Sequence, residues 1–180
     1  MSWIMIGLGR TAQALSFAGV VGAAAGILLI TGIILLEIIL RTFFASSTFM
    51  SDEIVGYLIA AVGFLPLGYA FADGAILRVN LVLSWTEDRP RLRSAIEICC
   101  VVATVAVVGM LIWYLFGNVA RQFTRGYTSG TMSGIPQWIP SGVMLAGLVI
   151  FWFQVVVYGL GVALGTKPII VEKADETSIA

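Results

Sequence analysis

Four long runs of hydrophobic residues, separated by polar or charged segments, dominate the pattern along the chain. Their approximate bounds are residues 12–36, 54–72, 96–117 and 139–164. A helix of about 20 apolar residues crosses the hydrocarbon layer of a bilayer, because it rises about 1.5 Å per residue and the layer is about 30 Å thick. The pattern therefore predicts an all-α integral membrane protein, with four transmembrane helices in a single domain over residues 1–180.

The second run has the clearest ends. Ser51 or Asp52 is expected to cap this helix, and Asp52 and Glu53 suit the positive end of its dipole. Gly74 suits the left-handed backbone that often follows a helix. Pro66 removes one backbone hydrogen bond and kinks the helix, which is tolerated where a neighbouring helix covers the freed carbonyl. We therefore expect Pro66 to lie at a contact with another helix or subunit.

Small residues recur along the first run. Ala14, Ala18, Gly22 and Gly26 are spaced four residues apart, and small side chains allow two membrane helices to approach closely. We predict that Gly22 and Gly26 lie at such a contact. A cleaved signal peptide is the competing interpretation, but the apolar region exceeds the about 7 to 15 residues of such peptides.

Charged residues follow the first run and precede the second. Glu37 stands four residues before Arg41, the favourable order for an ion pair on a helix, and pairing lowers the cost of charge near a membrane. We predict that Glu37, Arg41 and Glu53 form a cluster that fixes the first two helices to each other or to another subunit. The alternative is that Glu37 or Arg41 lines a proton or ion path.

The region between the second and third runs is predicted to lie at the membrane interface. Hydrophobic residues alternate over residues 76–85, but a lone strand beside a membrane has no pairing partner, so an interfacial helix or extended segment is expected. The arginines of this region suit anionic lipid headgroups or a partner on the cytoplasmic side, or simply fix the orientation of the chain. These are Arg78, Arg89, Arg91 and Arg93.

Lysine and arginine predict the orientation of the chain. An even number of spans puts both termini on one side, and the side richer in Lys and Arg is cytoplasmic. Both termini are therefore expected in the cytoplasm, and the long 117–138 loop with Arg121 and Arg125 on the opposite side. Arg10, Arg78, Arg89, Arg91, Arg93, Lys167 and Lys173 fall on the first side, and Arg41, Arg121 and Arg125 on the second.

Composition narrows the classes of function. Hydrophobic residues make up 59% of the chain and charged ones 11%, against about half and about a quarter in soluble domains. The net charge of zero indicates no nucleic-acid partner, and the absence of histidine removes histidine-ligated haem and histidine metal sites. No pattern suggests a catalytic site, so we expect neither enzyme activity nor a cofactor. Cys99 and Cys100 are expected to be small buried residues rather than a redox pair.

The hydrophobic runs also carry no charge near their middles. A carrier acting alone needs polar groups near the middle of the bilayer, so the chain is expected to be a subunit that serves a partner. One alternative is a small homodimeric proton-coupled four-helix exporter with Glu37 as its coupling site. Another is a membrane anchor for a redox enzyme, although the lack of histidine argues against a haem-bearing one.

Four sequence features follow one another in a characteristic order and spacing: Leu40-Arg41, Ser51-Asp52-Glu53, residues 73–80 and residues 134–140. Together they resemble the small membrane subunit, of the DctQ-like type, of a tripartite ATP-independent periplasmic (TRAP) transporter. The resemblance extends from about Leu15 to Leu164. Ile76 and Asn80 depart from the family pattern, which often has histidine and aspartate there, whereas Arg78 matches.

The resemblance implies a multi-pass protein of the bacterial inner membrane, bound to a large multi-helix (M-type) subunit that carries the substrate and sodium sites. It also implies a periplasmic substrate-binding protein that delivers an organic acid. The small subunit would steady the stationary part of the transporter and offer the binding protein part of its docking surface. We predict that Arg121 and Arg125 belong to this surface.

Overall fold

The computed structural model describes residues 2–48, 50–73, 90–130 and 133–163. Within these ranges the chain is helical apart from its connections, and four helical segments are long and apolar enough to cross a membrane. The predicted all-α class with four spans is therefore confirmed. The helices are α1 (Ser2–Phe44), α2 (Ser51–Phe64), α3 (Leu67–Ala72), α5 (Pro90–Arg125) and α6 (Trp138–Ala163).

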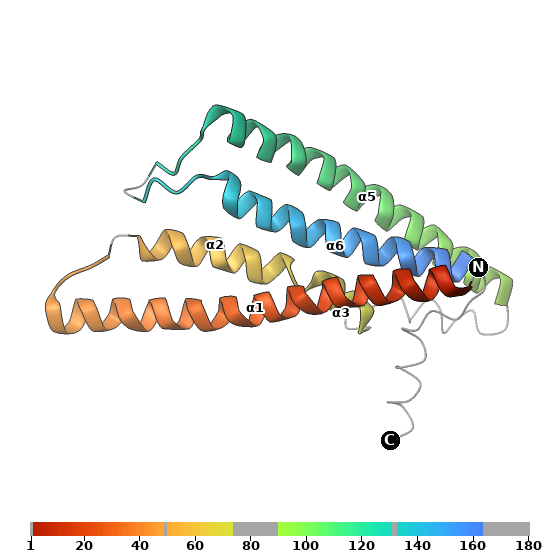
Figure 1. Ribbon diagram of the computed structural model, residues 1–180, viewed down its shortest axis with the longest axis horizontal. Coiled ribbons are helices and arrows are strands. Elements are labelled where there is room, and N and C mark those ends of the chain that lie inside the picture. Colours follow the sequence, from red (N-terminus) through yellow and green to blue (C-terminus); the bar gives the residue numbers. More distant parts are fainter. Residues whose placement is uncertain (1, 49, 74–89, 131–132, 164–180) are drawn as a thin grey trace, which may run out of the picture.

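The helices lie side by side in an elongated bundle (Figure 1). The start of α1 and the end of α6 lie at one end of the bundle, and the α1–α2 and α5–α6 connections lie at the other. The central helix is α6, which contacts α1, α2, α3 and α5. It also carries several of the most buried side chains, because a helix that is hydrophobic on all sides is suited to the interior. These include Leu148, Val155 and Tyr158.

Two helices run further than their hydrophobic runs. Helix α1 continues past residue 36, through Glu37, to Phe44, and α5 continues past residue 117 to Arg125. Arg121 and Arg125 therefore lie on the last turns of α5, and their predicted place in a loop was wrong. Gly126 ends this helix with φ of 62°, a left-handed conformation that costs glycine little.

Pro66 breaks the second span in two. Before the break, the Leu65 amide donates a hydrogen bond to the Ala61 carbonyl at 2.9 Å. After the break, the Ala70 amide donates one to the Pro66 carbonyl at 2.9 Å. Proline has no amide hydrogen and clashes with the preceding turn, which explains why α2 stops at Phe64 and α3 begins at Leu67. Backbone carbonyls at the break, including those of Phe64 and Leu65, are released from the helical bonding pattern.

Glycines on both neighbouring helices cover this break. A Cβ atom on Gly19 of α1 would lie 2.3 Å from the Leu65 carbonyl oxygen, and one on Gly147 of α6 would lie 2.6 Å from that of Phe64. The Cα–H groups of both glycines therefore point at the released carbonyls, a weakly favourable contact between helices. The break is held between α1 and α6 at positions that accept only glycine without displacement.

The buried stripe of α1 differs from the small-residue face seen in the sequence. Ala14, Ala18 and Gly22 are exposed, whereas Gly26 is buried and a Cβ there would lie 2.8 Å from Val62 Cγ2. The buried positions alternate spacings of three and four, because a helix has about 3.6 residues per turn and a strict four-residue repeat drifts around it. They include Ala12, Ser16, Gly19, Ala23, Gly26 and Glu37.

Some sequence predictions fall outside the described residues. The interfacial segment over residues 76–85, Gly74, Arg78 and Arg89 are among these, as are the side chains of Arg91 and Arg93.

Cys99 and Cys100 are free and exposed, so their predicted burial was wrong.

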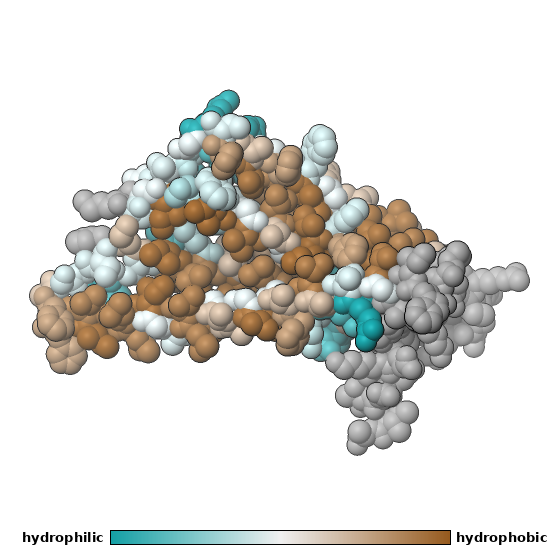
Figure 2. All heavy atoms as spheres, viewed as in Figure 1, coloured by the Kyte–Doolittle hydropathy of each residue, from teal (hydrophilic) through white to brown (hydrophobic). Residues whose placement is uncertain are grey.

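On the face of the bundle seen in Figure 2, the surface between the two ends is largely apolar, as its brown area shows. Leu28 on α1 is 75% exposed and Trp113 on α5 is 83% exposed. Such a surface suits lipid or the helices of another membrane protein.

Candidate functional site

Glu37, near the end of α1, is a charged side chain with only 8% of its surface exposed. Its carboxylate accepts five hydrogen bonds from groups close to the α1–α2 connection. Oε1 accepts hydrogen bonds from Arg41 Nε at 2.8 Å and Ser47 Oγ at 2.5 Å. Oε2 accepts hydrogen bonds from Thr48 Oγ1 at 2.6 Å, the Thr48 amide at 3.3 Å and Ser51 Oγ at 2.9 Å.

These hydrogen bonds join α1 to the α1–α2 connection and to Ser51, the first residue of α2. A carboxylate away from water is costly unless it is hydrogen-bonded, and bonds to an ionised acceptor are among the stronger ones. The Thr48 and Ser51 hydroxyl oxygens also lie within hydrogen-bonding distance of each other, and because each hydroxyl has one proton, a bond between them replaces one of their bonds to Glu37. Ser51 therefore holds Glu37 instead of capping α2, whose N-cap is Met50 without a side-chain capping bond.

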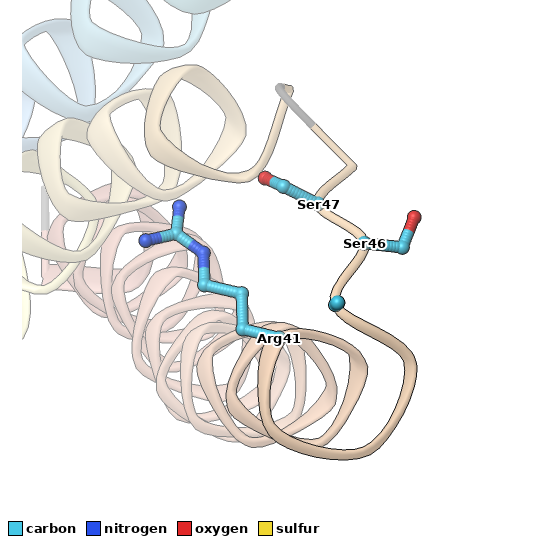
Figure 3. A pocket seen from close by; sticks show the side chains of 4 residues that line it. Arg41, Ser46 and Ser47 are labelled. Carbon is cyan, nitrogen blue, oxygen red and sulfur yellow. The ribbon is translucent and has the colours of Figure 1, made fainter.

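Arg41 completes the pair on the outer side. Its side chain is 61% exposed, although Nε is committed to Glu37. Beside it lies an open hollow of about 410 Å³, lined by Arg41, Ala45, Ser46 and Ser47. In Figure 3 the Ser47 side chain turns toward the neighbouring helix while that of Ser46 points away from Arg41. Ala45 has φ of 46° where the chain leaves α1.

Glu53 bonds to a different part of the protein. Its Oε1 accepts the Tyr57 hydroxyl at 2.5 Å, and its Oε2 accepts Ser133 Oγ at 2.5 Å. Two residues of helix correspond to a rotation of about 200°, so Glu53 points away from the side on which Ser51 meets α1. The structure thus brings Glu37 and Arg41 together and directs Glu53 to the segment before α6.

The connection between α5 and α6 folds back on itself. An isolated antiparallel bridge pairs Thr128 with Pro136, and the Ser129 amide donates to the Ile135 carbonyl at 2.9 Å. Arg125 Nη1 donates to the Tyr127 hydroxyl at 3.1 Å, so this arginine borders the connection, and Arg121 is exposed one turn earlier.

Sequence reasoning did not identify the hydroxyl groups of this end of the molecule. Ser47, Thr48, Tyr57 and Ser133 hold the two glutamates, yet none carries a charge or belongs to a recognisable motif. One signal was present, since Ser46, Ser47 and Thr48 follow directly on the charged pair. No group of three or more His, Cys, Asp or Glu side chains among the described residues is arranged to hold a metal ion.

Three buried polar atoms of the described residues have no hydrogen-bond partner. They are Ser16 Oγ, Gln154 Oε1 and Gln122 Oε1. Ser16 is fully buried and Gln154 is 3% exposed. A Cβ on Gly68 would lie 2.8 Å from Ser16 Oγ and 3.1 Å from Ile150 Cγ2. Ser16 therefore packs where α1, α3 and α6 meet.

A protein-family model matches a large part of the chain. The family model described as "Tripartite ATP-independent periplasmic transporters, DctQ component" matches residues 30–161. The matched range contains Glu37, Arg41 and Glu53 and extends from the last third of α1 into the last turn of α6. Comparisons with curated proteins and with solved structures gave no match.

Proposed function

Because the chain belongs to the DctQ family of small TRAP transporter subunits in the inner membrane, we propose that it scaffolds a large M-type subunit in sodium-coupled uptake of an organic acid. It also offers a periplasmic substrate-binding protein part of its docking surface. Both termini lie in the cytoplasm, so the α5–α6 connection faces the periplasm.

The observation that supports an accessory role is where the charged residues lie. In α2, α3 and α6 the charged residues are Asp52 and Glu53, both in the first turn of α2. Glu37 is held by five local hydrogen bonds. A carrier that works alone needs polar groups near the middle of the bilayer for its substrate and ions. The homodimeric exporter gains no support, because its coupling site would be this locally bonded carboxylate.

The docking role is supported by the exposed residues where α5 meets the α5–α6 connection. Arg121 and Arg125 are exposed on the last turns of α5, and Tyr127, 44% exposed, lies in the connection that follows. Exposed cations beside an aromatic side chain suit an acidic patch on a soluble partner, since charge complementarity guides association.

Reconstitution into liposomes with an inward sodium gradient tests the proposal. The chain, the large subunit and the binding protein are added singly, in pairs and together, and uptake of radiolabelled organic acids is measured. Accumulation is expected only with all three components. Accumulation with this chain alone would refute the accessory role, and uptake by the other two components at the full rate would refute the scaffold.

A further inference from the structure

The guanidinium group of Arg41 is only partly used. Arginine carries five N–H donors, and the described contact of Arg41 is the bond from Nε to Glu37. Among the described residues the two terminal amino groups have no hydrogen-bond partner. They belong to a side chain that is 61% exposed beside the open hollow formed with Ala45, Ser46 and Ser47 (Figure 3).

An apolar stripe leads from this arginine along the outside of α1. Ile38, Ile34 and Ile27 are 53%, 44% and 52% exposed, and their spacing puts them on the helix face that ends in Arg41. Thr31 lies on the same face and is exposed, and its hydroxyl donates a hydrogen bond to the Ile27 carbonyl at 3.0 Å.

The length of this stripe corresponds to one lipid leaflet. Arg41 lies fourteen positions after Ile27, which corresponds to a rise of about 21 Å along the helix. Half of a bilayer, headgroups included, is about 20 to 22 Å thick. A cation at the headgroup level and an exposed apolar strip of this length fit one molecule that is anionic at one end and apolar along the rest.

We propose that the hollow at Arg41 binds the phosphate group of a membrane phospholipid, whose acyl chain lies along Ile38, Ile34 and Ile27. The two terminal amino groups of a guanidinium match two phosphate oxygens, which a lysine ammonium does not reproduce. Glu37 offsets the charge of Arg41, so the apolar contact is needed for binding and a free phosphate ion is not retained. The inference requires only that the chain spans a membrane, and not the transport role.

Native mass spectrometry tests this site. The protein is extracted from membranes in mild detergent with the subunits that accompany it, and bound phospholipids are counted per copy of this chain. Arg41→Gln should lose one phospholipid and Arg41→Lys should retain it only in part. Arg125→Gln is the matched control, because it removes an exposed arginine from the same end of the bundle and should leave the count unchanged.

A second measurement separates the headgroup from the chain. A short-chain phospholipid should raise the thermal unfolding midpoint of the unmodified protein. The increase should be smaller in Arg41→Gln and in the double variant Ile34→Ser with Ile38→Ser. Inorganic phosphate should leave it unchanged. Three results would overturn the proposal. The first is an equal lipid count in Arg41→Gln and the unmodified protein, and the second is a higher unfolding midpoint with inorganic phosphate alone. The third is loss of an accompanying subunit from Arg41→Gln at an unchanged lipid count. The last would assign Arg41 to an acidic group on that subunit.

Discussion

Gly19 on α1 lies against the backbone of Leu65, at the point where Pro66 separates α2 from α3. A Cβ atom on Gly19 would come within 2.3 Å of the Leu65 carbonyl oxygen. This contact is between two backbones, so no side-chain rotation can relieve it. It links the packing of α1 directly to the broken helix.

Gly19→Ala should therefore destabilise the protein. The added methyl group must displace either α1 or the break, and overpacking of this kind costs about 1 to 3 kcal/mol. Thermal unfolding in detergent, followed by tryptophan fluorescence, measures the effect.

Gly32→Ala is the control for this substitution. Gly32 lies on the same helix with nothing within 4 Å of an added Cβ, so alanine there should be neutral or slightly stabilising. Equal unfolding midpoints for the two variants would contradict the close contact at Gly19.

The bonds around Glu37 should couple the α1–α2 connection to subunit assembly. Glu37→Gln removes the negative charge to which Arg41 and the three hydroxyl groups donate hydrogen bonds. We therefore expect a several-fold lower yield of the complex with the large subunit in a pull-down. Arg41→Gln should lower the yield less, because the hydroxyl groups remain. The double variant should lose less than the sum of the two, as expected for groups in contact.

Asp52→Asn provides the matched control for charge. Asp52 is an exposed acid in the first turn of α2, one residue from Ser51, and its neutralisation should leave the yield unchanged. Strict additivity of the Glu37 and Arg41 effects would argue against the pairing as an assembly element.

Charge reversal on the last turns of α5 should weaken docking of the binding protein. In Arg121→Glu with Arg125→Glu the attraction to an acidic partner becomes repulsion, and we expect association about tenfold slower at low salt. Biolayer interferometry with the complex in nanodiscs measures the rate. The difference from the unmodified protein should shrink as salt screens the charges.

Arg10→Glu is the control for docking, because Arg10 is exposed near the opposite end of α1. Membrane assembly should survive in both variants. Unchanged association of the α5 variant would remove these arginines from the docking surface.

Cysteine labelling tests the orientation of the bundle in the membrane. In a background without Cys99 and Cys100, a cysteine at Ser129 should react with an impermeant maleimide added from the periplasm. A cysteine at Ser178 should react only after the membrane is opened. Reaction of both from the same side would contradict four spans with cytoplasmic termini.

The sequence by itself determined the features that depend on neighbouring residues. Hydropathy over windows of about 20 residues was sufficient for the four spans, and Pro66 was sufficient for the break, because it lacks the amide hydrogen that the helix needs. The Glu37–Arg41 pair also followed from sequence, since a spacing of four residues puts both side chains on one face of a helix.

Only the tertiary structure decided which groups complete these features. Ser51 lies 14 positions from Glu37, and Ser133 lies 80 positions from Glu53, so neither bond follows from helical spacing. Gly147 covers the break from α6, although nothing near it in the sequence distinguishes it from other membrane glycines. Hydropathy records how apolar a segment is, whereas the partner of a hydroxyl group or a released carbonyl depends on how each helix is rotated against its neighbours.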